Sequence, residues 1–395
     1  MAIQKVMVAI GTRPEAIKMA PIINALKNDS RFECSVCSTG QHKEMLEQVF
    51  DWFDIKADHT LDVMRPGQPL AKLSGRILSG MQDVFSHYRP DTVLVHGDTT
   101  TAFLSALAAF YNYNFYDHSK IKVGHVEAGL RTGNLLSPYP EEANRRLIAP
   151  IADYHFAPTL TSAHSLNNEG ITENIFITGN SVIDALYETR ERIKDQNIQP
   201  FPFIKNGHKT ILVTGHRREN YGEGFKNLCH ALKLVADKYS NVNIVYPVHL
   251  NPNVKGPVYE LLGDYHNIFL VDPMDYPTFV AAMCQSDIVL TDSGGLQEEA
   301  PSLGKPVLVL RDTTERPEAL KAGTVQLVGT NETLILNAIS KLLEDEVHYK
   351  KMSSAVNPYG DGKTTKRILN ILAGECPTEN VFAPNGNSAI FQKPA

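Results

Sequence analysis

Residues 290–318, LTDSGGLQEEAPSLGKPVLVLRDTTERPE, decide the fold that this sequence predicts. The apolar run that ends at Thr291 has the length and composition of a buried strand in a parallel sheet. The small residues 293–295 then permit a tight turn, and residues 296–303 have the pattern of a short helix. Residues 307–310 predict the next strand, so the stretch forms one strand–helix–strand unit of an α/β fold.

The turn in this stretch also has the properties of an anion site. A strand, a small-residue turn and a helix start aim backbone N–H groups at one point, which suits a phosphate group. Glu298 and Glu299 in the first helical turn suit the helix dipole, and one of them could accept hydrogen bonds from sugar hydroxyls. The turn alone favours an ordinary strand–helix–strand unit. Arg311 and Arg316 just after the second strand make an anion site the better interpretation.

Length and composition describe a globular chain of ordinary type. At 395 residues the chain predicts two domains, and its 43% hydrophobic and 21% charged residues are typical of a soluble protein. The sequence contains no run of about 18 apolar residues, so no membrane span is predicted. The N-terminal residues lead directly into a strand without a signal peptide, which predicts a cytoplasmic protein. A net charge of −6 gives no support for nucleic acid binding.

The five cysteines do not predict a disulfide framework or a redox centre. Cys34 and Cys37 form a single C-x-x-C motif, but it lies within the predicted strand at residues 32–38. Their odd spacing places the two side chains on opposite faces of that strand, and no second pair is present. Structural cysteines are therefore favoured over a zinc or redox site.

The two halves of the chain repeat one plan. A strand, a glycine, a polar residue and an arginine follow one another at residues 8–13 and again near residue 213. Two doubly wound α/β domains with parallel sheets are predicted, residues 1–180 and 181–356, with a linker region near residues 199–208. Ligands of such folds bind beyond the carboxyl ends of strands, so we expect the site in the cleft between the domains. Residues 373–395 predict a flexible tail.

Polar residues cluster just after the predicted strands, where such a cleft would be lined. Any one of them is more often an ordinary surface residue, but strand ends of both halves contribute to the set. These residues are Arg13, Asp98, Glu127, His216, Arg217, His249, Ser293, Arg311 and Arg316.

Three carboxylates in this region are candidates for proton transfer. Asp98 follows Gly97 at a strand end, although it could equally cap the next helix. Glu127 lies at a turn after a strand, and Glu141 opens a predicted helix, where complementing the helix dipole is an alternative role. His216 and His249 show no metal-ligand spacing, so no metal site is predicted.

Several long motifs resemble the non-hydrolysing UDP-N-acetylglucosamine 2-epimerases. The match extends from about residue 5 to about residue 372, and only residues 111–120 and the tail are foreign to it. The motifs are GTRPEAIK at 11–18, HGDTTT at 96–101, HVEAGLRT at 125–132, PEEANRR at 140–146, TGHRREN at 214–220, PVHLNPNV at 247–254, residues 291–318, and NPYGDG at 357–362.

The resemblance implies a GT-B-like fold of two Rossmann-like domains, with a final helix within residues 357–372 returning to the first domain. It implies reversible inversion at carbon 2 of UDP-N-acetylglucosamine to give UDP-N-acetylmannosamine, with UDP as a ligand. Carried over by motif, the substrate-binding residues are Arg13, Lys18, Asp98, Glu127, His216, Phe279, Ser293, Gly294, Gly295, Glu299 and Arg316. The catalytic set is Asp98, Glu127, Glu141, Arg145 and His216.

The chemistry of the reaction fits these residues. The hydrogen on carbon 2 is not beside a carbonyl, so two routes remain: transient oxidation by NAD, or elimination of UDP followed by re-addition. A single G-x-G at residues 222–224 lacks the third glycine of a dinucleotide motif, which favours elimination without a cofactor. Elimination needs carboxylates for proton transfer and cations for the departing diphosphate.

Some members of this family are activated by their own substrate at an adjacent site. Gln41, His42, Arg217 and His249 match part of that site, whereas Glu44 and Gly67 depart from it. The resemblance also implies a homodimer that supplies N-acetylmannosamine units for surface polysaccharide. Three alternatives are a hydrolysing relative that releases free N-acetylmannosamine, a GT-B glycosyltransferase, and a nucleotide-sugar sensor without turnover.

Overall fold

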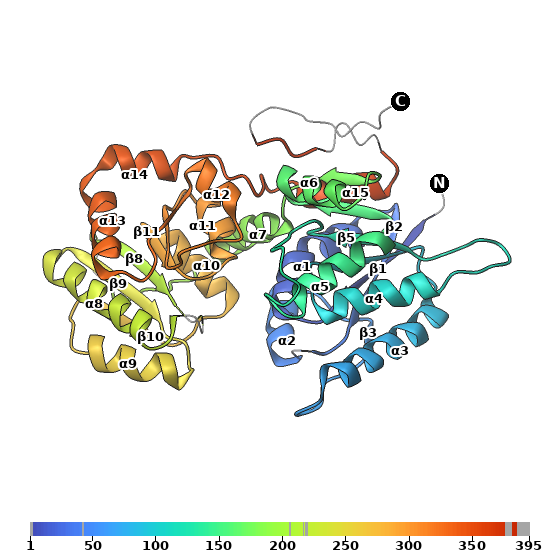
Figure 1. The fold of residues 1–395 in the computed structure, drawn as a ribbon, viewed down its shortest axis with the longest axis horizontal. Helices are drawn as coiled ribbons and strands as arrows, with labels where there is room; N and C mark the ends of the chain where they lie inside the picture. Colours follow the sequence, from blue (N-terminus) through green and yellow to red (C-terminus); the bar gives the residue numbers. More distant parts are fainter. Residues whose placement is uncertain are drawn as a thin grey trace. The chain divides into compact units, whose positions relative to one another are not determined.

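The chain folds into two compact units (Figure 1). The computed structural model describes residues 3–41, 43–204, 207–215, 217, 220–375 and 381–384. Unit 1 comprises Met1–Ala185 together with Tyr359–Ala395, and unit 2 comprises Leu186–Pro358. The chain therefore leaves unit 1 inside helix α7 (Ser181–Asp195) and returns to it at Tyr359. The linker predicted near residues 199–208 is wrong, because that segment lies within unit 2 and buries Phe201.

The described residues of unit 1 form a seven-stranded parallel sheet. Its strand order is β3-β2-β1-β4-β5-β6-β7, which is the doubly wound arrangement that reverses direction between β1 and β4. Near-continuous burial of β1 and β4 explains their unbroken apolar runs. The strands are β1 Gln4–Ile10, β2 Phe32–Ser38, β3 His59–Thr60, β4 Thr92–His96, β5 Lys122–Val126, β6 Tyr154–Ala157 and β7 Ile175–Ile177.

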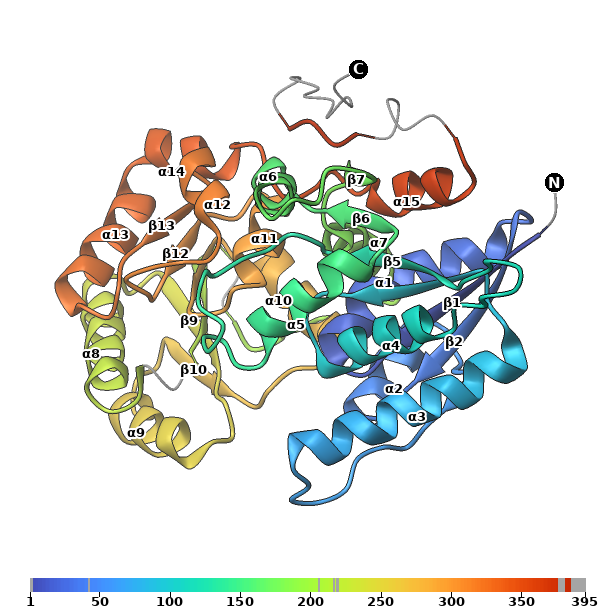
Figure 2. The same ribbon diagram turned by 45° about the vertical axis from the view of Figure 1, so that its right-hand side comes forward.

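Helices cover both faces of this sheet (Figure 2). Helix α1 packs against α2 and α15, and α4 packs against α3 and α5. Helix α3 shows why the sequence forms a helix here, because its buried residues Leu73, Ile77, Met81 and Phe85 recur every four positions. The helices are α1 Arg13–Asn28, α2 Lys43–Trp52, α3 Leu70–Tyr88, α4 Thr100–Tyr111, α5 Glu141–Ile148, α6 Leu160–Asn168 and α15 Thr364–Leu372.

Unit 2 repeats the plan with a six-stranded parallel sheet in its described residues, in the order β10-β9-β8-β11-β12-β13. Its strands are β8 Lys209–Thr214, β9 Val242–Pro247, β10 Ile268–Val271, β11 Ile288–Thr291, β12 Val307–Val309 and β13 Val325–Leu327. Its helices are α8 Glu223–Lys238, α9 Pro252–Leu262, α10 Tyr276–Gln285, α11 Leu296–Ser302, α12 Pro317–Ala322, α13 Glu332–Glu344 and α14 Glu346–Ser353.

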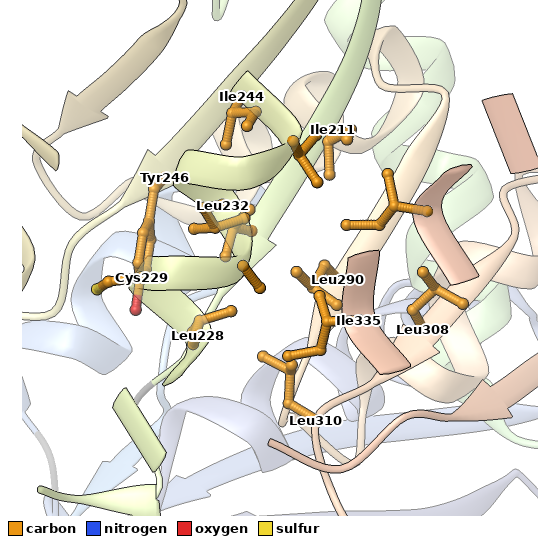
Figure 3. Packing of buried hydrophobic residues seen from close by; sticks show 14 of the residues in the cluster. Ile211, Leu228, Cys229, Leu232, Ile244, Tyr246, Leu290, Leu308, Leu310 and Ile335 are labelled. Atoms are coloured by element: carbon orange, nitrogen blue, oxygen red, sulfur yellow. The ribbon is translucent and has the colours of Figure 1, made fainter. Parts of the chain in front are cut away.

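The core of unit 2 lies between this sheet and helices α8 and α13 (Figure 3). Leu228 and Leu232 of α8 and Ile335 of α13 pack into one buried cluster with Ile211 of β8 and Leu290 of β11. The strand that opens the deciding stretch is therefore central to this core, which holds the turn after it in place.

The predicted fold class, two doubly wound parallel α/β domains, is confirmed. The predicted helix at 141–151 is α-helical only to Ile148 and continues as a 3-10 turn, Ala149–Ile151 (η1), because Pro150 has no N–H to donate. Helices α6, α9, α12, α13 and α14 and strands β3 and β13 were not predicted. The helices among the described residues are too short or too polar to form a membrane span.

The C-terminal part beyond α15 is described only in places. Residues 376–380 and 385–395, most of the predicted tail, lie outside the described residues. Phe382 in the described segment 381–384 is buried against Ala157, Ala163 and Ile177. Its amide donates a hydrogen bond of 2.7 Å to the carbonyl of Ile177 in β7, so this segment borders the sheet edge of unit 1.

Candidate active site

A buried glutamate joins two strand-end loops of unit 1. The Glu15 carboxylate accepts hydrogen bonds from the amides of Gly11 (3.1 Å) and Thr12 (2.7 Å) and from the Thr12 hydroxyl (2.8 Å). Its other oxygen accepts a hydrogen bond of 2.6 Å from the Thr99 hydroxyl, in the loop after β4. Gly11 has no room for a side chain, because an added Cβ would lie 2.1 Å from Thr101 Oγ1. The loop that carries Arg13 and the loop that carries Asp98 are thus fixed to each other.

Glu127 lies at the end of β5 in a strained and buried position. Its φ of 64° is in the left-handed region, which is unusual for a residue other than glycine and is typical of functional sites. The Lys18 ammonium of α1 forms an ion pair with Glu127 Oε2, and both side chains are mostly buried. Asn180 Nδ2 donates a hydrogen bond of 2.8 Å to the same oxygen. A buried carboxylate with a cation and a directed N–H donor is well suited to proton transfer.

Asp98 is held from two sides by α5. Arg145 forms an ion pair with the Asp98 carboxylate, and Asn144 Nδ2 donates a hydrogen bond of 2.8 Å to the Asp98 carbonyl. The buried Glu142 carboxylate in turn lies 3.4 Å from Arg145 Nη1 and accepts a hydrogen bond from the Thr132 amide. Capping of α4 is performed by Thr99, whose hydroxyl accepts from the Ala102 amide, so that alternative for Asp98 is wrong.

Glu141 and Glu142 are neighbours with different surroundings. Glu142 is fully buried and holds backbone amides and arginines. Glu141 is half-buried, and its Oε2 is buried without a hydrogen-bond partner among the described residues. An oxygen in that state requires a polar group from a ligand or water, whereas Glu142 already has protein partners.

Three neutral histidines lie on adjacent strands beside these carboxylates. Burial lowers the pKa of His96 to about 4, that of His125 to about 3 and that of His155 to about 4. Neutral His125 donates from Nε2 to the Gly97 carbonyl at 2.7 Å, which fixes the residue before Asp98. His96 Nε2 lies 3.7 Å from Glu127 Oε2. The ionic partner of Glu127 at neutral pH is therefore Lys18.

In unit 2, arginines gather at the glycine turn after β11. Glu315 accepts a hydrogen bond of 2.6 Å from Arg311 Nη1 and one of 3.3 Å from Arg217 Nη2. Its Oε1 lies beside Gly294, where an added Cβ would be only 3.0 Å away. Burial opposes the ionised form, but a backbone amide and the charges of Arg316 and Arg311 hold the pKa of Glu315 at about 2. The turn therefore has two arginines close to it, both bound to the Glu315 carboxylate.

Arg316 is anchored within the same group. Its Nε donates to the buried Glu298 carboxylate, and its amide donates to the Thr314 hydroxyl at 3.1 Å. The backbone of Glu298 is held as well, because Asn357 Nδ2 donates a hydrogen bond of 2.6 Å to the Glu298 carbonyl. Glu299 lies beside the turn, because an added Cβ on Gly295 would be 3.6 Å from its Oε2.

The structure divides the predicted site residues between the units. Lys18 contacts Glu127, and Arg145 contacts Asp98, in unit 1, where Arg13 opens α1. Unit 2 brings Arg217 and Arg311 together at Glu315. Gln41 accepts a hydrogen bond of 3.3 Å from Thr101 Oγ1, and the exposed His249 accepts one of 3.1 Å at Nδ1 from the Asn251 amide. Phe279 is half-buried in α10, and Ser293 is half-buried in the turn. His42 and His216 lie outside the described residues.

Sequence reasoning missed Glu15, Glu142, Asn180 and Glu315 as parts of these groups. Glu15, Glu142 and Glu315 stand within the quoted motifs, so a signal was present for them. Asn180 lies three positions after the last strand of the first half, which was its only signal. In the described part of the chain, no group of three or more His, Cys, Asp or Glu side chains is arranged to hold a metal ion.

The cysteines lie apart from these groups. The described cysteines Cys34, Cys37, Cys229 and Cys284 carry free thiols. Burial raises the pKa of Cys34 and of Cys37 to about 12, which suppresses the reactive thiolate. The prediction of structural cysteines at positions 34 and 37 agrees with these surroundings.

Comparison with known proteins gives a consistent result over nearly the whole chain. The family model described as UDP-N-acetylglucosamine 2-epimerase matches residues 24–373. A relative from Yersinia pestis named UDP-N-acetylglucosamine 2-epimerase is 54% identical over 375 residues, 93% of this chain and 98% of the relative. One of the same name from Escherichia coli K12 is 53% identical over 375 residues, with the same coverage.

Solved structures agree with the sequence relatives. The crystal structure of UDP-GlcNAc 2-epimerase from Neisseria meningitidis bound to UDP-GlcNAc has a TM-score of 0.85 and 50% identity, covering 94% of this chain and 100% of that one. The Methanocaldococcus jannaschii enzyme in complex with UDP-GlcNAc and UDP has a TM-score of 0.76 and 32% identity, covering 94% and 100%. The two units thus have the GT-B-like fold of these enzymes.

Proposed function

The chain belongs to the UDP-N-acetylglucosamine 2-epimerase family, and we propose that it interconverts UDP-N-acetylglucosamine and UDP-N-acetylmannosamine by elimination and re-addition of UDP. The observation that carries this proposal is the buried Glu127 carboxylate, ion-paired with Lys18 and bound by Asn180 at the carboxyl end of the unit 1 sheet. A sensor or a simple UDP carrier has no need of such a group.

Unit 2 supplies the UDP-binding residues in this proposal. The turn Ser293–Gly295 offers close backbone approach for the diphosphate, and Arg316 offers a guanidinium close to it. Glu299 accepts hydrogen bonds from the ribose hydroxyls. His216, Arg13 and Phe279 complete the UDP contacts by motif. These donors stabilise the negative charge that forms on UDP as its bond to the sugar breaks.

Unit 1 supplies the proton-transfer residues. One carboxylate among Asp98, Glu127 and Glu141 takes the hydrogen from carbon 2 as a proton. The electron pair of that C–H bond forms a double bond between carbons 1 and 2, and the carbon 1–oxygen bond breaks with its pair on UDP. A second carboxyl group then gives a proton to the opposite face of carbon 2, and UDP re-adds at carbon 1. Arg145 keeps Asp98 in place throughout.

Product analysis tests this function. UDP-N-acetylglucosamine is incubated with the protein and followed by proton NMR. We expect an equilibrium mixture of two UDP-sugars with no free sugar. Accumulation of free N-acetylmannosamine and UDP would instead identify a hydrolase, and an unchanged spectrum would leave only a transferase or a sensor.

We also propose a homodimer in the cytoplasm. The segment between α4 and β5, which Figure 1 shows extending from unit 1, exposes Phe115 and Tyr116 at 82% and 98%. Large aromatic side chains exposed to this degree favour a protein partner, for which we propose a second copy of this chain. Light scattering should report a dimer, and the double variant Phe115→Ser/Tyr116→Ser should weaken it. A monomeric wild-type protein would reject the proposal.

Activation by substrate is the remaining proposal from the family resemblance. Gln41 and His42 of unit 1 and Arg217 and His249 of unit 2 are the residues involved. Initial rates at increasing UDP-N-acetylglucosamine should rise sigmoidally, and a hyperbolic curve would contradict the proposal.

A further inference from the structure

Asn180 lies where the two chain segments that connect unit 1 to unit 2 meet, and it contacts Glu127. It lies three positions after the end of β7 and is 2% exposed. Its Nδ2 donates to Glu127 Oε2 at 2.8 Å, a contact between residues 53 positions apart in the sequence. Its Oδ1 accepts from the Val182 amide at 3.0 Å, which fixes the orientation of the amide group.

The backbone of Asn180 binds the two segments by which unit 1 continues into unit 2. The Asn180 amide donates to the Tyr359 carbonyl at 2.6 Å, and Tyr359 is the residue at which the chain re-enters unit 1. The Asn180 carbonyl accepts from the Ile183 amide at 3.1 Å, two residues before the chain leaves unit 1 after Ala185. One residue therefore contacts the outgoing segment, the returning segment and Glu127.

This junction is closely packed. An added Cβ on Gly360 would lie 3.0 Å from Ile183 and 3.4 Å from the Asn180 carbonyl oxygen. Gly179, with a φ of 87°, has the Thr364 hydroxyl 2.9 Å from the place of an added Cβ. Asn180 has little freedom to move by itself, so its side-chain amide is a fixed reference point for Glu127.

The neighbours of Glu127 Oε2 differ in how they can direct a carboxylate. Lys18 is a flexible point charge, which favours ionisation but imposes little orientation. His96 Nε2 lies 3.7 Å away, beyond a good hydrogen bond, and has no hydrogen-bond partner among the described residues. Asn180 provides a planar N–H donor whose own geometry is fixed by Val182.

We infer that Asn180 is a positioning residue for the reaction, which orients the Glu127 carboxylate and ties it to the segments 181–185 and 359–361 of unit 1. This inference rests on the proposed function, since it gives Asn180 a role only if Glu127 transfers a proton. Asn180 itself has no proton-transfer role. It acts through the direction of the Glu127 oxygen that receives or gives the proton, where small misplacement is costly.

The variant Asn180→Asp tests the inference with little change of shape. Aspartate keeps the acceptor for the Val182 amide, loses the donor to Glu127 and brings a negative charge next to the Glu127 carboxylate. The groups that face Glu127 in the described structure, Lys18 from α1 and His96 from β4, are unchanged. We expect kcat to fall about 100-fold with UDP affinity within twofold of wild type. The acidic limb of the kcat/KM profile should move to higher pH, because two carboxylates then face each other.

A charge-free variant and a matched control complete the experiment. Asn180→Ala should lower kcat by about 10- to 100-fold and move the acidic limb in the same direction by less. Asn24→Ala removes another asparagine donor of unit 1, to the Phe53 carbonyl at 3.0 Å, and should leave kcat within twofold of wild type. If Asn180→Asp and Asn180→Ala do not fold, Asn180→Ser, which is neutral and removes less of the side chain than alanine, decides by the same readouts.

Two results overturn the inference. Folded Asn180 variants with kcat within twofold of wild type would show that Glu127 needs no direction from Asn180. A lower kcat with an unchanged pH profile would show a merely structural role. Wild-type protein without epimerase activity would refute the proposed function itself, so the two failures are distinguishable.

Discussion

Glu15 and Glu315 lie at corresponding sheet edges of the two units, and they have opposite electrostatic environments. Burial raises the pKa of Glu15 to about 7, although four neutral donors from Thr99, Thr12 and Gly11 favour its ionised form. Burial also opposes ionisation of Glu315, but a backbone amide and two arginines hold its pKa at about 2. Neutral donors do not compensate burial of a charge, whereas cations do.

The two sheet edges also differ in the charges around them. In unit 1, Glu15 is buried among neutral donors, while Glu127 and Asp98 are each paired with one cation, Lys18 and Arg145. Unit 2 collects arginines around its glycine turn, an environment that binds anions. Under the proposed function, one sheet architecture serves proton transfer in one unit and UDP binding in the other, according to the side chains at its carboxyl edge.

The largest effect on turnover is expected from replacing the carboxylates of unit 1. Glu127→Gln keeps the shape of the side chain but removes its charge, so kcat should fall by about 1000-fold or more. Asp98→Asn should also abolish most turnover. Calorimetry should show UDP affinity within threefold of wild type for both, because neither Glu127 nor Asp98 is among the proposed UDP contacts. Glu169→Gln, which alters the partly exposed partner of Arg131, is the matched control and should retain full kcat. Unaltered turnover in the Glu127 and Asp98 variants would remove the site assignment.

Acidification should affect unit 1 more than unit 2. His96, His125 and His155 have lowered pKa values in the folded state, so the unfolded chain binds more protons as the pH falls from about 6.5 toward 4. Stability is lost over that window, by roughly 2 kcal/mol per histidine at pH 5. Glu15 offsets roughly one histidine, leaving a net loss of about 4 kcal/mol.

Hydrogen exchange measures this difference by region. Protection factors in β4, β5 and β6 should fall between pH 7 and pH 5, while those in β8, β9 and β11 should change less. Among the described histidines of unit 2, a lowered pKa is found for half-buried His348. Equal loss of protection in both units would contradict the contrast.

The arginines of unit 2 should control UDP affinity. Replacing Arg316 alone would leave the buried Glu298 without its cation, so we choose the double variant Glu298→Gln/Arg316→Gln. UDP affinity should fall about 10- to 100-fold, the loss expected for one charge-assisted contact. The exposed pair in Arg190→Gln/Glu191→Gln is the matched control and should leave UDP affinity unchanged. Calorimetry that gives equal affinities for both double variants would exclude Arg316 from the UDP site.

Glu15→Gln gives the smallest effect and isolates the titration of this group. The folded-state pKa of Glu15 lies above its ordinary value, so its contribution to stability is present below about pH 4.5 and is lost as the pH rises through about 7. Glutamine cannot titrate, so stability at pH 8 relative to pH 5 should rise by roughly 2 kcal/mol compared with wild type. Chemical denaturation at the two pH values measures this difference. An identical pH dependence of stability in both proteins would show that Glu15 does not titrate between pH 5 and pH 8.

The sequence predicted most strands because buried parallel strands are short apolar runs followed by glycine or polar residues. The strand predicted at residues 32–38 has these limits in the structure, and the strand predicted to end at Thr291 does end there. Helix α9 was missed because Pro257 and Gly256 lie within it, and β13 because three residues give too little periodicity. The strand-end positions of Asp98 and Glu127 could be predicted for the same reason as the strands. Arg316 lies farther from its strand, at the start of α12.

The contacts of these residues could not be predicted. Lys18 and Glu127 are 109 positions apart, and only the folded sheet brings them together. Glu141 and Glu142 are adjacent in sequence, and which of them is buried depends on how α5 packs on α4. Nothing in the sequence around Asn180 indicates its contacts with Glu127 and Tyr359. These contacts exist only in the folded chain.

The fate of the hydrogen on carbon 2 tests the account most directly. UDP-N-acetylglucosamine is incubated with the wild-type protein in deuterated water, and carbon 2 of the UDP-N-acetylmannosamine formed is observed by NMR. Exchange of a carboxyl proton with solvent during the reaction predicts one deuterium at carbon 2 of the inverted product. Inverted product that retains its original hydrogen would contradict proton transfer by the carboxylates of unit 1.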